Sequence, residues 1–500
     1  MENENSKASK IIITISVIII FAIMCAGIAL IIVYGNKTIN QSNRNTQYIK
    51  NEEEELETEE QNETMISNEI IIEDKSQTLN RRFGKVEILW LDNQNNIIKE
   101  PNKPILKEMT AQKYNESSSS FIDIDENSSE WYNYSTKLWA NAKDDKGSYF
   151  VWIPRYAYKI TYYSDNTYRE KIGYCDYRGI LKISDNNTLI RIKGNATGLQ
   201  EVGNHYILAP AFMRDTASGY RNGGWDGNLS GIWVAKYEMS MELSGKHMET
   251  STSKIGNVMT DNNVRAVSKP SVSSWRNISI ANCYYNSYNY NREYESHLMK
   301  NSEWGAVAYL SHSVYGTNTY KITVNDTNNY ITGGSKVESE VYNYRVNQSS
   351  NGNVTGVFDL AGGAGEFISG FINNGYQGLT IYGGIQQSFL YENSMNSKYK
   401  TIYSNISSDD GKGNYNSTFA NGNYELNFGK RGDAIYETSA TGFGTESWNT
   451  NSSFFMQQDT PFISRGGDFA GGTSTGIFSF NGNSGQASAG ESYRVVLAME

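Results

Sequence analysis

The sequence predicts an α+β fold with few helices and long ordered loops, preceded by a transmembrane helix and a stalk. Three features point to it: one long apolar run, one acidic stretch, and many short strand-like runs separated by turn residues. The 500 residues exceed one ordinary compact core, so several units are expected. We divide the chain into a tail (1–10), a transmembrane helix (11–33), a polar and acidic stalk (34–80), a small β-rich unit (81–148) and a larger domain (149–500).

The apolar run covers residues 11–33, where Thr14 and Ser16 are the only polar side chains and no residue is charged. At about 1.5 Å per residue, a helix of this length crosses a hydrocarbon layer of about 30 Å. The competing interpretation is a cleaved signal peptide, but its apolar region is usually about 7–15 residues long and ends in a small-x-small site, which is missing after Val33. We therefore expect a single-pass protein of the cell membrane with its C-terminal part extracellular.

Negative charge is concentrated in residues 51–74, which contain eleven acidic side chains and no lysine or arginine. Self-repulsion and low hydrophobicity predict an extended stalk there, with a solvated helix over 52–60 as the alternative. The whole chain has a formal net charge of -10, so the remainder is nearly neutral. Without a basic stripe, no nucleic-acid partner is expected.

The region after the stalk alternates between apolar and turn-rich segments. Residues 86–91, 149–160 and 231–238 are typical of strands, and an imperfect apolar stripe over 294–312 predicts one long helix. Aromatic residues between 131 and 139 suit either a packed core or a ligand-stacking face, and we favour the core because a small unit needs such residues to fold.

Four segments of the larger domain occur in an order that resembles formylglycine-generating enzymes, the sulfatase-modifying-factor branch of the C-type-lectin-like fold. They are residues 150–154, residues 231–238, residues 270–275 leading to 300–309, and residues 356–367 with the closing 464–469 and 492–497. The resemblance covers about 149–500 and implies a C-type-lectin-like domain.

The catalytic residues of that family are absent. Its enzymes bind copper through two cysteines, and those positions fall on Gly471 and Gly476, so the resemblance implies a non-catalytic member without copper. Cys175 and Cys283 match no family position, and a disulfide between them is left open. The four histidines form no His-x-x-x-His or His-Glu-x-x-His pair, which argues against non-haem iron.

A calcium site is implied by the resemblance to the family's calcium loop. The carboxylates would come from Asp359 and Glu366 and the carbonyls from Gly362 and Ala364, which are hard oxygen ligands suited to Ca²⁺. The alternative is that both carboxylates only accept hydrogen bonds from the backbone or from Arg465.

A ligand-binding face is predicted over residues 468–491, which are rich in the Ser, Gly and Asn side chains of adaptable contact surfaces. This stretch also resembles the variable region of ligand-binding proteins diversified by retroelements. A codon bias toward A and T would give a similar composition, and Phe478 could belong to the core because alternate strand positions point opposite ways. The predicted ligand-binding residues are Asp468, Phe469, Thr473, Ser474, Thr475, Phe478, Asn481 and Asn483.

The favoured function is therefore a membrane-anchored extracellular binding or display protein that recognises an unknown protein or glycan at the cell surface. A divergent enzyme of the formylglycine-generating family and a structural surface appendage subunit are the alternatives.

Overall fold

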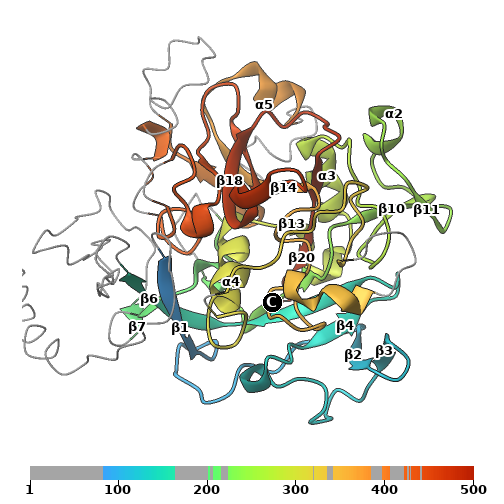
Figure 1. Cartoon of the computed structure of the whole chain (residues 1–500), viewed down its shortest axis with the longest axis vertical. Helices are drawn as coiled ribbons and strands as arrows, with labels where there is room; N and C mark the ends of the chain where they lie inside the picture. Colours follow the sequence, from blue (N-terminus) through green and yellow to red (C-terminus); the bar gives the residue numbers. More distant parts are fainter. Residues whose placement is uncertain are drawn as a thin grey trace, which may run out of the picture. The chain divides into compact units, whose positions relative to one another are not determined.

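The computed structural model separates residues 1–78 from a second compact unit, residues 79–500. The structure describes residues 83–163, 201–202, 206–214, 223–318, 320–334, 342–383, 397–405, 422–424, 427, 430–439 and 442–499. All of them belong to the second unit, called the folded unit below (Figure 1). The expected tail, membrane segment and stalk lie outside the described residues.

The expected fold class needs one correction, which concerns the membrane helix. Across the described parts of the chain, no helix combines the length and apolarity needed to cross a membrane. The described architecture is mixed and β-rich with several sheets. Residues 11–33, where the transmembrane helix was expected, lie outside it.

The largest sheet has seven strands in the order β13-β20-β9-β5-β4-β2-β3. In the order of the chain these are β2 (Thr110–Asn115), β3 (Ser120–Asp123), β4 (Asn141–Lys143), β5 (Tyr149–Pro154), β9 (Gly231–Ala235), β13 (His297–Leu298) and β20 (Val495–Leu497). Strand β9 is buried along its whole length and β5 nearly so, because both faces of the sheet are covered there.

The strands of the predicted 81–148 unit are built into the same sheets as the larger region. Strand β1 (Phe83–Trp90) pairs along all eight residues with β6 (Tyr156–Tyr163), and β4 pairs with β5 across residue 148. One buried cluster contains Trp131 and Trp139 together with Trp152 and Trp233. Residues on both sides of the expected boundary therefore share a core.

Two smaller sheets complete this part of the molecule. The four-stranded sheet has the order β1-β6-β8-β7, with β7 at Glu201–Val202 and β8 at Tyr206–Leu208. The three-stranded sheet has the order β11-β10-β12, with β10 at Ser240–Leu243, β11 at Lys246–Met248 and β12 at Val264–Val267.

The six-stranded sheet positions the candidate site. Its path is β15 (Thr401–Tyr403), β14 (Gly365–Ile372), β17 (Phe462–Gly466), β18 (Gly476–Asn483) and β16 (Ser453–Phe454), and β19 (Glu491–Tyr493) also pairs with β14. Phe462 pairs with Phe371 on one side and with Asn483 on the other. The end of β14, the start of β17 and the end of β18 therefore lie side by side at one end of these strands.

The helices of the described residues are short. Among the described residues, the α-helices with defined bounds are α2 (Ser253–Gly256), α3 (Ile280–Tyr288), α4 (Asn301–Ser311) and α5 (Gln377–Ile381). The 3₁₀ segments are η1 (Tyr134–Thr136), η2 (Pro210–Phe212), η3 (Arg292–Tyr294), η4 (Tyr342–Gln348), η6 (Ser397–Tyr399), η7 (Trp448–Thr450) and η8 (Gly472–Ser474).

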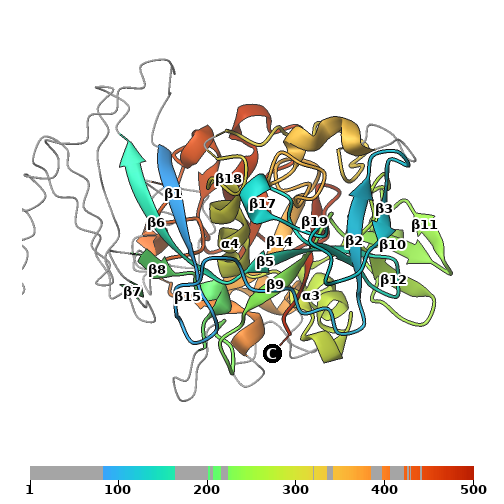
Figure 2. The same ribbon diagram turned by 90° about the horizontal axis from the view of Figure 1, so that it is seen from below.

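The long helix expected over 294–312 is replaced by η3, β13 and the shorter α4. Helix α4 begins after Lys300 because the Glu303 carboxylate accepts the Lys300 backbone N–H at 2.9 Å, which caps the first turn. All of its residues except Ser302 are buried, so it has no solvent-facing stripe. Both views place α4 in the middle of the folded unit (Figures 1 and 2).

Candidate functional site

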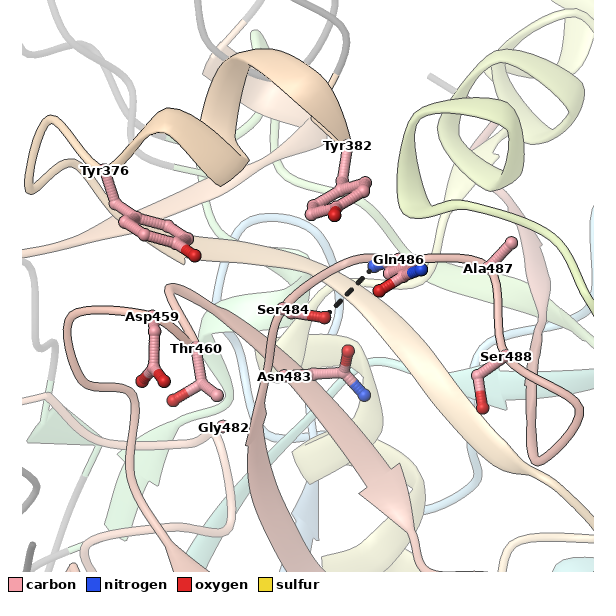
Figure 3. Close-up of a pocket in the computed structure, with 10 residues that line it drawn as sticks. All are labelled: Tyr376, Tyr382, Asp459, Thr460, Gly482, Asn483, Ser484, Gln486, Ala487 and Ser488. Atoms are coloured by element: carbon pink, nitrogen blue, oxygen red, sulfur yellow. Dashed lines mark hydrogen bonds between the residues drawn. The ribbon is translucent and has the colours of Figure 1, made fainter. Parts of the chain in front are cut away.

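A pocket of about 580 Å³ lies at the edge of the six-stranded sheet where β14 and β18 end and β17 begins. Three segments supply its ten lining residues: the ends of α5, the turn before β17, and the chain from the last residues of β18 to Ser488. Figure 3 shows two tyrosine rings on the α5 side, facing the loop that follows β18. The hydrogen-bonded ends of β14, β17 and β18 thus hold three separate chain segments around one cavity.

The α5 side presents Tyr376 and Tyr382, which flank this five-residue helix and are both partly exposed. Gly378 lies between them. A Cβ at Gly378 would come 2.5 Å from Cε1 of Tyr376 and 3.5 Å from Cδ2 of Tyr382. The absence of a side chain at this position therefore lets both rings lie close to the helix and face the pocket.

The turn before β17 supplies Asp459 and Thr460. Asn374 ties this turn to the loop after β14, because its Nδ2 donates to the Gln458 carbonyl at 3.0 Å. Thr460 is only 3% exposed, and its hydroxyl has no hydrogen-bond partner among the described residues. Asp459 is partly exposed and is the only lining residue with a carboxylate.

The third side begins at Asn483, whose amide is held at both ends. Its Nδ2 donates to Glu491 Oε1 at 2.8 Å, and its Oδ1 accepts the Gly485 N–H at 2.9 Å. Gly485 has φ of +82°, and a Cβ there would also lie 2.5 Å from the Phe462 ring, so the loop turns where only glycine fits well. Ser484, Gln486 and Ser488 of this segment add neutral polar groups to the lining.

Helix α3 fastens two sides of the pocket together. Its first N–H groups have no partner within the helix. The N–H of Ile280 donates to the Gly485 carbonyl at 3.0 Å, and the N–H of Ala281 donates to the Tyr382 carbonyl at 3.1 Å. The tyrosine side and the loop after β18 are thus anchored on one rigid element.

Glu491 is the strongly perturbed ionisable group next to the pocket. Burial, together with the nearby charge of Asp468, raises the pKa of its carboxyl to about 8, against the hydrogen bonds from Ser464 and Asn483. Because Asn483 lines the pocket, the Glu491 carboxyl lies one hydrogen bond away from it.

The eight predicted ligand-binding residues are not brought together. Asn483 lines the pocket, whereas Thr475 and Phe478 are buried. Phe478 contacts Trp448 and His312 edge-on, so it occupies the core position that the sequence left open. Asn481 accepts a hydrogen bond from the Ser452 hydroxyl at 2.6 Å.

The remaining predicted residues form a turn of their own between β17 and β18. The Thr475 hydroxyl donates to the Asp468 carbonyl at 2.9 Å, and the Ser474 hydroxyl donates to the Gly471 carbonyl at 2.7 Å. Thr473 is exposed in this turn, and Phe469 packs edge-on against Tyr330.

Several pocket residues were missed by the sequence argument, above all Tyr376, Tyr382 and Asp459. The available signal was a pair of tyrosines around a glycine directly after a strand, in a chain segment rich in Asn and Gly. The turn holding Asp459 carries no comparable signal.

The implied calcium site is corrected by the contacts of its two carboxylates. Glu366 forms a buried bidentate pair with Arg494, at 2.7 and 2.9 Å, and Asp359 accepts the Gly333 N–H and the Asn325 amide. Among the described residues, no group of three His, Cys, Asp or Glu is arranged to hold a metal ion. Calcium binding therefore has no support, and the hydrogen-bonding alternative describes both carboxylates, with Arg494 in the role considered for Arg465.

The other two residues of the implied calcium loop, Gly362 and Ala364, have structural roles. Gly362 has φ of +78°, and the Ala364 N–H donates to Glu238 Oε1 at 2.9 Å. Burial, with the nearby Asp359 and Glu366, raises the pKa of Glu238 well above its usual range. Three carboxyl groups thus surround one arginine, and burial favours protonation of Glu238.

At the positions compared with copper-binding cysteines, a side chain would displace a neighbouring polar side chain. A Cβ at Gly476 would overlap the Asn451 amide, and one at Gly471 would overlap the Thr475 hydroxyl. Cys283 is a buried free thiol whose pKa is raised by burial, and Cys175 lies outside the described residues.

No protein-family model matches the chain, and no curated protein matches it. The expected relation to sulfatase-modifying factors therefore has no support from the comparisons, and the site has to be interpreted from its own chemistry.

Proposed function

We propose that the folded unit is a binding protein whose ligand occupies the pocket between α5 and the loop after β18. The observation that carries this proposal is the lining itself: two partly exposed aromatic rings face a set of polar groups that are held in place by other parts of the protein. Binding sites commonly combine apolar contact area with a few fixed polar groups in cavities of roughly 300–1,000 Å³.

Preorganisation supports recognition. Asn483 is fixed by Glu491 and Gly485, and the backbones of Tyr382 and Gly485 are fixed by α3. A ligand that enters such a site orders few further side chains, which reduces the entropic cost of binding.

A screen of small polar fragments against the full-length protein tests the proposal. In ligand-observed NMR, we expect the hits to compete with one another and to disappear with Tyr382→Ala. Hits that are spread over the surface and are insensitive to this substitution would remove the pocket as a binding site. Tyr320→Ala, at an exposed tyrosine that does not line the pocket, is the matched control.

We also propose that the folded unit is exposed at the cell surface, as expected from the sequence. Protease treatment of intact cells should then degrade it, and full protection in intact but not in lysed cells would contradict this location. The enzyme and appendage alternatives stay predictions.

A further inference from the structure

The two tyrosines offer flat apolar area in an otherwise polar cavity. Both rings are partly exposed and lie on the same side of the pocket (Figure 3). Aromatic rings bind other rings or flat apolar faces, while a tyrosine hydroxyl also forms hydrogen bonds. A ligand of this pocket therefore combines at least one apolar face with polar groups along its edge.

The polar side is almost entirely neutral. Asp459 brings one carboxylate, and the segment from Asn483 to Ser488 brings amide and hydroxyl groups. An anionic ligand would meet the carboxylate without a compensating cation in the lining. A purely apolar ligand would cover the amide and hydroxyl groups and leave them without hydrogen bonds, which is unfavourable.

A cationic ligand is the other chemistry that two rings and a carboxylate suggest. It would use Tyr376, Tyr382 and Asp459 and leave the donors of residues 483–488 unused. A ring with several hydroxyl groups uses the whole lining, because its C–H face covers an aromatic ring while its hydroxyls both donate to Asp459 and bind the neutral side.

We infer that the ligand of this pocket is a neutral oligosaccharide, stacked on the tyrosine rings and hydrogen-bonded to Asp459 and to the loop after β18. This inference rests on the proposed binding function and adds the class of ligand. The cavity of about 580 Å³ is large enough for one or two sugar rings.

The test uses the full-length protein on an array of immobilised oligosaccharides, with neutral hexose and N-acetylhexosamine chains beside acidic chains. Binding to neutral chains is expected, and titration calorimetry with the best of them should give an affinity about tenfold lower for Tyr382→Ala. Tyr382→Phe should keep most of the affinity, because the stacking face remains. Asp459→Asn should weaken binding by losing the anionic acceptor.

Gly378→Ala is a sharper variant because it removes no group that touches the ligand. The new methyl group displaces the Tyr376 ring, and a better helix former replaces glycine, so affinity falls several-fold while the melting temperature does not. Tyr320→Ala is the matched control and should bind as the wild type does.

Three results would overturn the inference: binding to acidic chains alone, binding to neutral chains that Tyr382→Ala and Gly378→Ala leave unchanged, or no binding to the array. Displacement of pocket fragments by tetramethylammonium but by no saccharide would assign the site to cations. If the array shows no binding, or if only tetramethylammonium displaces the fragments, fragments that still compete for the pocket would preserve the binding function although the saccharide inference fails. If neither saccharides nor fragments bind the pocket, both proposals fail.

Discussion

The polar side chains of the pocket differ in whether their atoms form hydrogen bonds within the protein. Both amide atoms of Asn483 are engaged by the protein, whereas the Thr460 hydroxyl has no partner among the described residues although it is buried. A hydrogen bond in a folded protein contributes about 0.5–1.5 kcal/mol net, and an unpaired buried donor costs more than that. The two residues should therefore respond differently to the loss of their polar atoms.

Thr460→Val is expected to leave the free energy of unfolding unchanged or slightly raised, because it removes a hydroxyl that forms no hydrogen bond. Thr355→Val is the matched control: its hydroxyl accepts the buried backbone N–H of Trp139 at 3.1 Å, and its loss should cost about 1–3 kcal/mol. Urea denaturation measures both. A loss at Thr460 as large as the loss at Thr355 would show that this hydroxyl has a structural partner.

The raised pKa of Glu491 predicts that the free energy of unfolding depends on pH. Its pKa is about 8 in the folded protein and near 4.5 when unfolded, so between these values the folded state holds the extra proton. Its contribution to stability is complete below about pH 4.5 and is lost as the pH rises to about 8. Glu491→Gln should make the decline of the unfolding free energy with pH shallower, by at most about 1.4 kcal/mol per pH unit.

Urea denaturation at several pH values between 5 and 8 compares the two slopes. Glu293→Gln, at an exposed carboxylate, should keep the wild-type slope. An unchanged slope for Glu491→Gln would show that the carboxyl is ionised throughout this range.

The sequence argument included Asn483 in its predicted ligand-binding stretch but could not place the residues that surround it in the structure. The argument for side chains on alternate faces assumes one face toward water, and β18 is buried from Gly476 to Phe480 on both faces. Phe478 therefore lies in the core. Tyr382 and Asp459 precede Asn483 by 101 and 24 positions along the chain. Only strand pairing brings the three segments together.

At the scale of elements, the buried pair of Glu366 and Arg494 connects β14 to the link between β19 and β20. Arg494 also donates to the carbonyls of Ala235 and Phe358, so one side chain joins four segments. A local motif cannot reveal such a partner, because the carboxylate and the guanidinium are 128 positions apart. This is why the loop from Asp359 to Glu366 was interpreted as a calcium site.

Glu366→Ala is expected to destabilise the folded unit by about 3–5 kcal/mol, because it leaves a buried guanidinium without its carboxylate. Asp326→Ala, which removes the exposed partner of Arg345, should cost less than about 1 kcal/mol. Thermal unfolding measures both, and adding a calcium chelator should leave the wild-type midpoint unchanged. A chelator-induced drop that Glu366→Ala abolishes would contradict the ion-pair interpretation.

At the scale of the whole molecule, the folded unit is tied together across the boundary expected at residue 148. Strands β4 and β5 form a hairpin there, and β1 pairs with β6. Strand and turn patterns identified β1, β5 and β9 from the sequence, but they give no information on which strands pair. The regions 81–148 and 149–500 consequently looked separable along the chain although they share sheets.

Truncation tests this integration. A chain that begins at residue 79 should unfold in urea as one cooperative transition, because it keeps every strand of the described sheets. A chain that begins at residue 149 should fail to fold cooperatively, since it lacks β1 to β4 and the tryptophans Trp90, Trp131 and Trp139 of the shared core. A sharp transition of the shorter chain would show that residues 81–148 are an accessory unit.

The pairing of Phe462 with both Phe371 and Asn483 also bears on how this protein can diversify. The three segments that line the pocket extend from strand ends that are paired with one another. Substitutions in these segments therefore alter the cavity without changing the register of the strands. Duplicated copies of the gene could therefore diverge at Tyr382 and Asp459 while selection keeps Phe462 and Gly485. Each copy would then present different side chains on the same backbone and acquire a different binding specificity.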